Sequence, residues 1–401
     1  MKLSKRSIFH ILHDDADHTK QTVSYRLPAI FGILIIAVLI FLPTGYEDAV
    51  IYQGTDRSRV EILATDNSNI ISTGLIQSGE QRCEVRMLGG KFKGETVWGI
   101  NMLTGSLESD KIFQQGDKAL AVISFQEDEI LSVNLIDHFR LNKEMILAAA
   151  FILFIILFAG KTGIRSILSF FLTVLVIWKI LVPSYLNGKN PIWIGFLVTI
   201  FLTAAIISLV YGFNKKAVSA VSGACLGIVT TGVLGILFTD AFQIHGAIMS
   251  YSESLLYSGY QDLNLTQIYM ASIFIGASGA MMDLAVDITS AVWEVVQKKP
   301  DISRREAVKS GMAVGRAAIG TMTTTLLLAY SGGYIALLMV FMAQGTPLDN
   351  ILNYKYVSAE ILDTIVGSFG LVTIAPFTAL TSGILLTGRK RSVTDKNMPE
   401  E

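Results

Sequence analysis

Eight apolar stretches recur along the sequence, and this repetition limits the fold more than any other feature. A helix needs about 17–25 mainly apolar residues to cross a bilayer. The stretches are residues 27–42, 145–160, 166–182, 192–211, 217–238, 268–296, 311–330 and 361–387. Because only helices and closed barrels can span a membrane, they predict an α-helical polytopic membrane protein with about eight spans.

Composition supports a membrane protein and excludes several other classes. Of the 401 residues, 51% are hydrophobic and 16% are charged, whereas a soluble chain carries about 25% charged residues. The net charge of −1 argues against nucleic-acid binding. Cys83 lies in a polar stretch and Cys225 in an apolar one, and the five histidines are scattered. We therefore expect no disulfide scaffold, no metal site and no cofactor.

The apolar stretches divide the chain into five parts. We predict a cytoplasmic tail (residues 1–26), an N-terminal anchor (27–43), an extracytoplasmic β-domain (44–142), a membrane domain of about seven spans (143–388) and a second cytoplasmic tail (389–401). A cleaved signal peptide is the alternative for the first stretch. The long tail before it, and the lack of a small-x-small site after Leu42, favour an uncleaved anchor.

Residues 44–142 have the pattern of a small β-domain. Glycines recur between short segments such as 84–88 and 119–125, which indicates strands bounded by turns. About seven short strands predict a small barrel or sandwich, with an OB-like barrel as one form. No catalytic or metal-binding constellation is visible, so we expect an accessory or docking domain.

The distribution of basic residues predicts the orientation of the spans. With the amino terminus inside, the tails and the short inner loops contain eighteen Lys and Arg residues. The short outer loops contain only Lys189 and Lys355. Cytoplasmic loops carry the excess of positive charge, so we predict a multi-pass membrane protein with both termini cytoplasmic.

The fifth apolar stretch carries small residues on one face. They recur at intervals of four, and the positions are Ser219, Gly223, Gly227, Thr231, Gly235 and Thr239. Such a pattern lets another helix approach closely. It favours tight helix packing over contact with a substrate, and it places this helix centrally in a bundle.

The sixth apolar stretch carries a polar face. Intervals of three and four residues place its members together, and they are Gly276, Gly279, Asp283, Asp287, Ser290 and Glu294. A carboxylate inside a membrane costs a few kcal/mol, so it generally serves a wet cavity, an ion or an ion pair. For Asp283 and Asp287 a functional face is favoured over a structural ion pair. Glu294 fits equally well as a solvated residue at the membrane boundary.

The seventh apolar stretch contains an arginine. Arg316 lies between Gly315 and Gly320, and Thr321 and Thr324 follow. Either Arg316 pairs with the carboxylates of the sixth stretch, or it extends towards the inner interface. The Ser331-Gly332-Gly333 sequence fits both a broken helix lining a cavity and the flexible end of an ordinary helix.

The eighth apolar stretch repeats the combination of small and polar residues. It contains Glu360, Asp363, Gly367, Gly370 and Pro376, and the proline predicts a kink.

Motifs in these last three stretches resemble the YibE/F family of bacterial membrane proteins. They are Gly276-Ala-Ser-Gly-Ala-Met-Met-Asp283, Trp293-Glu294, Ser310-Gly-Met-Ala-Val-Gly-Arg316, Gly320-Thr-Met-Thr-Thr-Thr-Leu326, Leu328-Ala-Tyr330, Ala359-Glu-Ile361 and Gly367-Ser-Phe-Gly-Leu371. The resemblance covers most of residues 140–387 and implies a YibE-type member, with a shorter YibF-type relative as a partner. Ala317 and Thr324 depart from the family pattern, which has an acidic residue and often Asn there.

These observations lead to a functional hypothesis. We expect a transporter, or a transporter subunit, for a small solute or ion. The expected pathway residues are Asp283, Asp287, Ser290, Glu294, Arg316, Thr321 and Thr324. The expected packing residues are Gly223, Gly227, Gly235, Gly276, Gly279, Gly315 and Gly320. The expected partners are the lipid bilayer and either a YibF-type protein or further copies of this chain.

The alternative hypothesis is a non-transporting membrane scaffold whose external domain docks a partner. We do not expect an enzyme, because two aspartates on one helix do not form a two-helix catalytic dyad.

Overall fold

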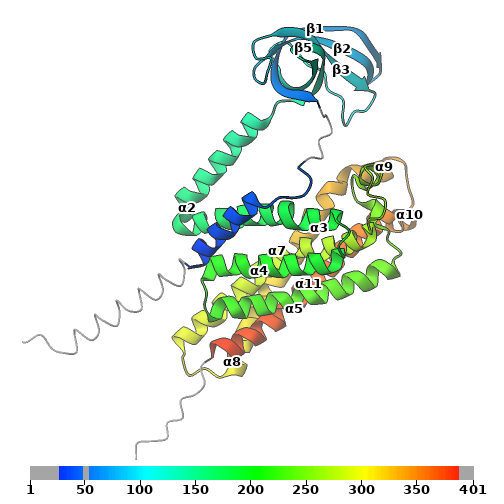
Figure 1. The fold of residues 1–401 in the computed structure, drawn as a ribbon. Helices are drawn as coiled ribbons and strands as arrows, with labels where there is room; N and C mark the ends of the chain where they lie inside the picture. The colour runs from blue at the N-terminus through cyan, green and yellow to red at the C-terminus, as the bar shows by residue number, and fades with distance from the viewer. Residues whose placement is uncertain (1–26, 48–53, 388–401) are drawn as a thin grey trace, which may run out of the picture. The chain divides into compact units, whose positions relative to one another are not determined.

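The computed structural model describes residues 27–47 and 54–387, and the predicted tails lie outside these ranges. The chain divides into two compact units (Figure 1). One unit comprises residues 46–158, and the other comprises the chain on either side of it. Each unit is described by itself.

The first unit contains a β-barrel. Its strands within the described residues are β1 (Thr55–Thr73), β2 (Ile76–Met87), β3 (Thr96–Thr104), β4 (Lys118–Gln126) and β5 (Glu129–His138). They close in the order β1-β2-β3-β5-β4. All neighbours are antiparallel except β3 and β5, which run parallel. This five-stranded barrel is of the OB type, so the sandwich alternative is wrong.

The expectation of about seven short strands is also wrong, and the reason lies in β1. This strand runs through 19 residues, and its pairing with β2 shifts register between Ile62 and Ala64 and again between Asp66 and Asn69. Such irregularities bend a long strand around a barrel. They also interrupt the alternation of apolar and polar residues, so one strand resembles two in the sequence.

The barrel encloses apolar side chains and a few polar ones, among them Gln81 and Asn101. Val60, Ile62 and Val85 are among the fully buried residues. Gln81 is also fully buried. Its side chain accepts a hydrogen bond from the amide of Phe113 and donates one to the carbonyl of the same residue, each at 2.9 Å. Gln81 therefore fixes the loop before β4 to the barrel interior.

Six helical stretches in the described part of the chain are long and apolar enough to cross a membrane. They are Leu141–Leu186, Pro191–Tyr211, Lys215–Ala241, Leu265–Lys298, Arg304–Ala343 and Lys355–Leu386. A shorter apolar helix, Leu27–Phe41, corresponds to the expected anchor. The apolar stretches of the sequence thus fold as helices. The described part of the structure has six long helical stretches and one shorter apolar helix, whereas the sequence predicts eight separate spans.

The difference arises in the first long stretch, which contains α2 (Leu141–Val176), the π-helical η1 (Ile177–Leu181) and α3 (Val182–Leu186). At Gly160 the backbone leaves the helical conformation, with φ 53° and ψ −126°. A residue with a side chain adopts positive φ only at a cost, whereas glycine does not. Gly160 therefore separates two helical segments that correspond to the predicted spans 145–160 and 166–182.

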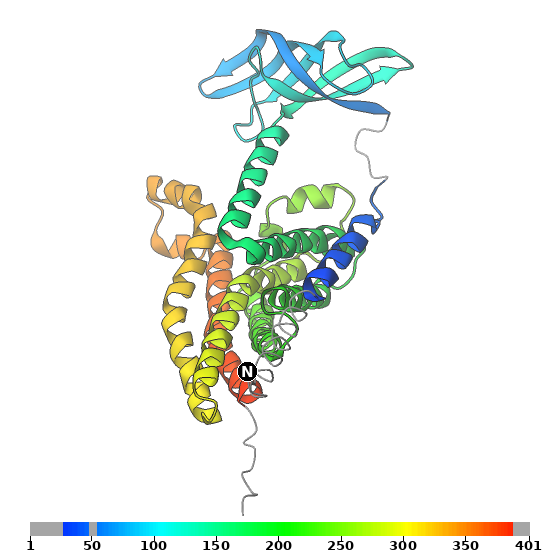
Figure 2. The same cartoon turned by 90° about the vertical axis from the view of Figure 1, so that its left-hand side faces the viewer.

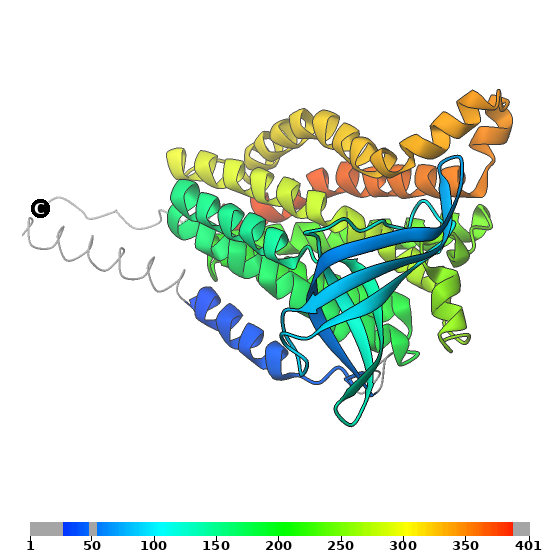
Figure 3. The same cartoon turned by 90° about the horizontal axis from the view of Figure 1, so that it is seen from above.

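The remaining elements follow in sequence. They are α4 (Pro191–Tyr211), α5 (Lys215–Ala241), η2 (Gly246–Ile248), α6 (Ser252–Tyr257), α7 (Leu265–Lys298), α8 (Arg304–Ser331), η3 (Gly332–Tyr334), α9 (Ile335–Ala343), α10 (Leu348–Leu352) and α11 (Lys355–Leu386). The central helix is α7, which packs against α4, α5, α8 and α11. Two perpendicular views show α8 running alongside α11 (Figure 2 and Figure 3).

The small-residue face of α5 packs within the chain. All six of its members are buried. A Cβ atom added at Gly223 would lie 2.7 Å from Cα of Thr378 on α11, and one added at Gly227 would lie 3.2 Å from Ile374. Gly235 faces Ile273 of α7 instead. The glycines allow these helices to approach more closely than larger residues would.

Candidate functional site

The polar face expected on α7 is present, and its middle part is not covered by another helix of the described chain. Gly276, Gly279, Asp283 and Asp287 are all exposed. The two aspartates lie near the middle of a helix long enough to cross a bilayer. This face therefore meets something other than the rest of the described chain.

Two other members of this face have partners. The hydroxyl of Ser290 lies 2.6 Å from that of Tyr211, which also donates a hydrogen bond to the carbonyl of Val286. Ser290 thus contributes to the contact between α4 and α7. Glu294 pairs with Lys298 one turn later, at 2.9 Å, and both side chains are well exposed. This geometry is that of a solvated residue near a helix end.

The structure does not bring Arg316 to the aspartates. Arg316 is exposed on α8, and it forms no ion pair with any acid in the described ranges. Thr321 donates its hydroxyl proton to the carbonyl of Ala318, and Thr324 donates to that of Gly320. Both threonines are therefore bonded to their own helix.

The glycines of α7 and α8 occupy different surroundings. A Cβ atom added at Gly315 would lie 2.8 Å from Ala375 and 3.1 Å from Ile288, which is a close helix contact. One added at Gly276 would lie 2.9 Å from the hydroxyl of Tyr330. At Gly279 and Gly320 an added Cβ would meet no atom of the described chain within 4 Å. These two glycines therefore make no close helix contact within the described chain, and the packing role expected for them stays a prediction.

A second polar group lies between α7, α8, η3 and α11. We call it the carboxylate–tyrosine cluster, and its members are Tyr269, Tyr330, Tyr334, Glu360 and Asp363. The acids are three residues apart on α11, so they share a face. The hydroxyl of Tyr269 donates to the carbonyl of Ala359 at 3.0 Å and also lies beside the carboxyl group of Asp363. The hydroxyl of Tyr334 faces Glu360.

The cluster contains buried oxygen atoms that have no hydrogen-bond partner in the described part of the chain. They are Oε1 of Glu360, Oδ1 of Asp363 and Oγ1 of Thr364. Apolar residues surround this region, including Ile244, Leu362 and Val366. Burying a polar group without a partner costs about 1–3 kcal/mol, and more for a charge. A proton or a bound cation would satisfy these oxygen atoms.

The donor set of the cluster limits which cation fits. Its oxygen atoms belong to carboxylate, phenol and hydroxyl groups, which suit a proton or a hard cation rather than a soft metal. Throughout the described residues, no three His, Cys, Asp or Glu side chains come together as a metal site. Two acids with neighbouring phenols are better suited to a single positive charge.

Glu360 and Asp363 are recognisable in the sequence as polar residues of the eighth apolar stretch, but they are not among the predicted pathway residues. The tyrosines belong to other elements: Tyr269 lies in α7, and Tyr330 and Tyr334, four residues apart, lie at the end of α8 and in η3. No local pattern in the sequence connects them to the acids. The available signal was the pair of acids at an interval of three, early in an otherwise apolar helix.

The helices, the barrel and the intramembrane acids together define a polytopic α-helical membrane protein that carries a small β-barrel domain. The sequence profile of the family described as YibE/F-like protein matches residues 147–388. The chain belongs to this family, which confirms the resemblance seen in its motifs. No curated protein and no solved structure matches the chain.

Proposed function

We propose that this protein is a membrane transporter, or a transporter subunit, for a small solute or ion, and that the carboxylate–tyrosine cluster binds the coupling proton or cation. One observation carries the proposal: two acids on a membrane helix retain buried oxygen atoms without partners in the described chain. Ionisable groups inside membrane helices commonly mark ion pathways and proton relays.

The position of the cluster favours exchange with one side of the membrane. Glu360 and Asp363 lie five and eight residues after the start of α11, which corresponds to about 8 and 12 Å along the helix. An ion can reach this depth from one surface without crossing the whole bilayer. Two ionised carboxylates this close would repel each other, so binding one positive charge is favourable.

The cluster also connects elements that can move relative to one another. Tyr334 belongs to η3, the short 3₁₀ segment between α8 and α9, and it directly follows Gly332 and Gly333. A proton arriving at Glu360 would change its hydrogen bonding with Tyr334. Interrupted helices of this kind serve transporters as gates and ion sites. The cluster can thus couple ion binding to movement of α9.

The exposed face of α7 supports a second part of the proposal. Asp283 and Asp287 lie near the middle of the helix, where contact with lipid would be costly. We propose that water and a second membrane subunit cover this face, either a YibF-type protein or another copy of this chain. The solute path would then run along the interface, with Asp283, Asp287 and Arg316 beside it.

The topology belongs to the same proposal. The two segments of α2 separated by Gly160, together with Leu27–Phe41 and the other long helices, provide eight crossings. With the distribution of Lys and Arg given above, both termini lie in the cytoplasm and the barrel lies outside the bacterial cell membrane.

Solute-driven proton movement tests the proposal. Vesicles that contain the protein are energised with a pH gradient, and a panel of solutes is screened for one that dissipates it. We expect Asp363→Asn to abolish this response and the matched control Asp349→Asn, on the exposed α10, to preserve it. A panel without any response, or an Asp363→Asn variant with full activity, would contradict the proposal.

One observation favours the alternative role as a docking scaffold. On the outer surface of the barrel, Trp98 and Met102 of β3 are 48% and 59% exposed, and Arg82 of β2 lies 5.5 Å from the centre of the Trp98 ring. Exposed aromatic residues beside arginine are common in interfaces. If docking is the function, Trp98→Ala should abolish the activity of the protein in cells, whereas Asp363→Asn should leave that activity unchanged.

A further inference from the structure

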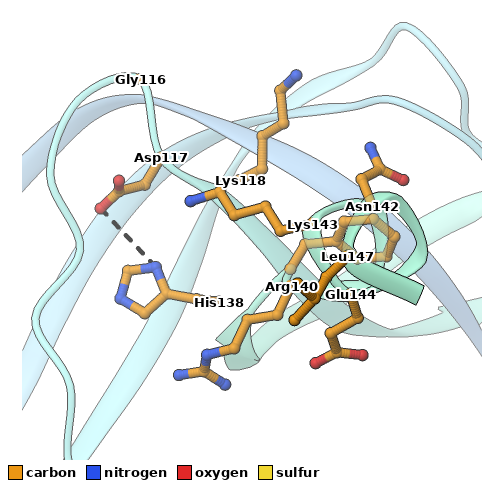
Figure 4. Close-up of a pocket in the computed structure, with 10 residues that line it drawn as sticks. Gly116, Asp117, Lys118, His138, Arg140, Asn142, Lys143, Glu144 and Leu147 are labelled. Carbon is orange, nitrogen blue, oxygen red and sulfur yellow. Dashed lines mark ion pairs between the residues drawn. The ribbon is translucent and has the colours of Figure 1, made fainter. Parts of the chain in front are cut away.

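A cavity with several basic side chains in its lining lies where the barrel continues into α2. It has a volume of about 660 Å³, and its lining comes from the start of β4, the end of β5 and the first turns of α2 (Figure 4). Lys118, Arg140 and Lys143 contribute the basic groups, and Leu147 contributes an apolar wall. All of these residues belong to one compact unit.

Of the acids at this cavity, Asp137 and Asp117 accept hydrogen bonds, whereas Glu144 forms no ion pair with any residue in the described ranges. Arg140 donates hydrogen bonds of 2.6 and 3.0 Å to the two carboxylate oxygens of Asp137, and it also lies near Glu144. Asp117 accepts a hydrogen bond from the backbone amide of Gln114 at 2.8 Å. Its carboxylate also lies 4.0 Å from the imidazole of His138, as the dashed line in Figure 4 marks.

The two lysines differ from Arg140. Neither Lys118 nor Lys143 forms an ion pair with any acid in the described ranges. They approach the cavity from different elements, since Lys118 begins β4 and Lys143 lies in the first turn of α2. A backbone hydrogen bond of 2.7 Å from Phe139, in the short link between β5 and α2, to the carbonyl of Lys118 holds this link against β4. The cavity therefore offers two free ammonium groups to an anion.

The helix that follows indicates the source of the anion. Met145, Ile146 and Leu147 are 61%, 70% and 73% exposed, and apolar side chains continue to residue 158. Leu147 lies four residues after Lys143, which is about 6 Å along the helix. The headgroup layer on each side of a bilayer is about 5–8 Å thick. Where α2 enters the hydrocarbon, Lys143 lies at the depth of the lipid phosphates.

We propose that this cavity binds the phosphate of an anionic phospholipid, held between Lys118 of the barrel and Lys143 of α2. The inference rests on the part of the proposed function in which α2 crosses the membrane. A lipid bound there ties the start of α2 and the adjoining β4 to the membrane surface. Basic side chains at a membrane surface each contribute about fivefold to the affinity for anionic lipid.

Lipid binding to the full chain tests the inference. The protein is placed in nanodiscs of phosphatidylcholine, with or without phosphatidylglycerol, and the retained lipid is counted by native mass spectrometry. We expect wild type to retain phosphatidylglycerol preferentially. Lys143→Gln should weaken retention about fivefold, and Lys118→Gln with Lys143→Gln more than tenfold. The matched control Lys93→Gln, an exposed lysine of the same unit that does not line the cavity, should behave like wild type.

Three results would overturn the inference. Equal retention by the double variant would show that the cavity is not the site. Competition by millimolar inorganic phosphate would identify a free anion as the ligand instead of a lipid. Reaction of a cysteine introduced at Phe151 with an aqueous maleimide would show that α2 does not enter the bilayer. A failure to observe solute-driven proton movement, by contrast, would contradict only the role proposed for the carboxylate–tyrosine cluster. Retention of phosphatidylglycerol would still test the lipid site.

Discussion

The hydroxyl groups of Ser219 in α5 and Ser382 in α11 lie 2.8 Å apart, although 163 positions separate them in the sequence. Ser382 also lies 3.1 Å from the hydroxyl of Thr289 in α7, and Thr381 donates a hydrogen bond to the carbonyl of Ser219. Lipid is as apolar as the helix surfaces, so close packing and such hydrogen bonds stabilise helix contacts. The three helices therefore form the fixed part of the bundle.

Replacing Gly223 by Leu should disrupt this contact. Even the Cβ atom would lie 2.7 Å from Cα of Thr378, so α5 and α11 would have to separate. Overpacking of this kind typically costs about 1–3 kcal/mol. Thermal unfolding of the purified protein in detergent measures the effect. Val229→Leu is the control, because Val229 lies on the exposed side of the same helix, and it should leave the melting temperature unchanged.

The sequence predicted the packing face of α5 but not its partner. An interval of four residues is a local property, whereas the choice of α11 depends on contacts across the whole membrane domain. Similarly, the sequence placed Asp283 and Asp287 on one face of α7, but it could not show that this face remains uncovered. The carboxylate–tyrosine cluster was missed because its tyrosines come from α7, α8 and η3. In the barrel, the register shifts of β1 concealed one long strand.

Replacing different tyrosines of the cluster should affect stability in one case and activity in the other. Tyr269→Phe removes the hydrogen bond to Ala359, so it should cost about 1 kcal/mol in the free energy of unfolding. Tyr334→Phe removes the hydroxyl that faces Glu360, and it should slow solute-driven proton movement while the melting temperature stays unchanged. Tyr257→Phe, at a side chain that is 86% exposed, is the control for both measurements. Full activity in Tyr334→Phe would exclude this phenol from the ion site.

Cysteine labelling in intact cells should establish the topology. The buried Cys83 offers a silent background, because burial raises the pKa of its thiol to about 11. At pH 8 only about one such thiol in a thousand is the reactive thiolate. With Cys225 replaced by Ser, a membrane-impermeant maleimide should label a cysteine introduced at Asn187 but not one introduced at Asp301. The opposite pattern would reverse the proposed orientation.

The barrel should lose stability in acid, partly through Asp137. The hydrogen bonds from Arg140 hold the pKa of the Asp137 carboxyl below its ordinary value. A depressed pKa in the folded state contributes stability above the ordinary pKa, and this contribution is lost as the pH falls through the folded value. Asp137→Asn should therefore flatten the profile of melting temperature against pH below about pH 5, where the carboxyl begins to take up a proton in the unfolded chain. Because the pair is exposed, the change should correspond to less than about 1 kcal/mol.

The aspartates on the uncovered face of α7 should matter for assembly and transport rather than for the fold of one subunit. Neither Asp283 nor Asp287 forms an ion pair or hydrogen bond with another side chain of the described residues. Their replacement by Asn should therefore leave the unfolding temperature of the separated subunit unchanged. If a second subunit covers this face, the same variants should weaken the complex that native mass spectrometry detects and abolish solute-driven proton movement.

Cross-linking directly tests whether a second subunit covers this face of α7. If the covering subunit is another copy of this chain, cysteines introduced at Gly279 of two copies should form a disulfide with each other when native membranes are treated with an oxidant, because no atom of the described chain lies within 4 Å of an added Cβ there. The control is a cysteine at Gly315, whose neighbours Ala375 and Ile288 belong to the same chain, and it should form no such cross-link. If Asp287→Asn instead destabilises the separated subunit and Arg316→Gln restores its stability, an ion pair within the chain explains both charges better than a partner does.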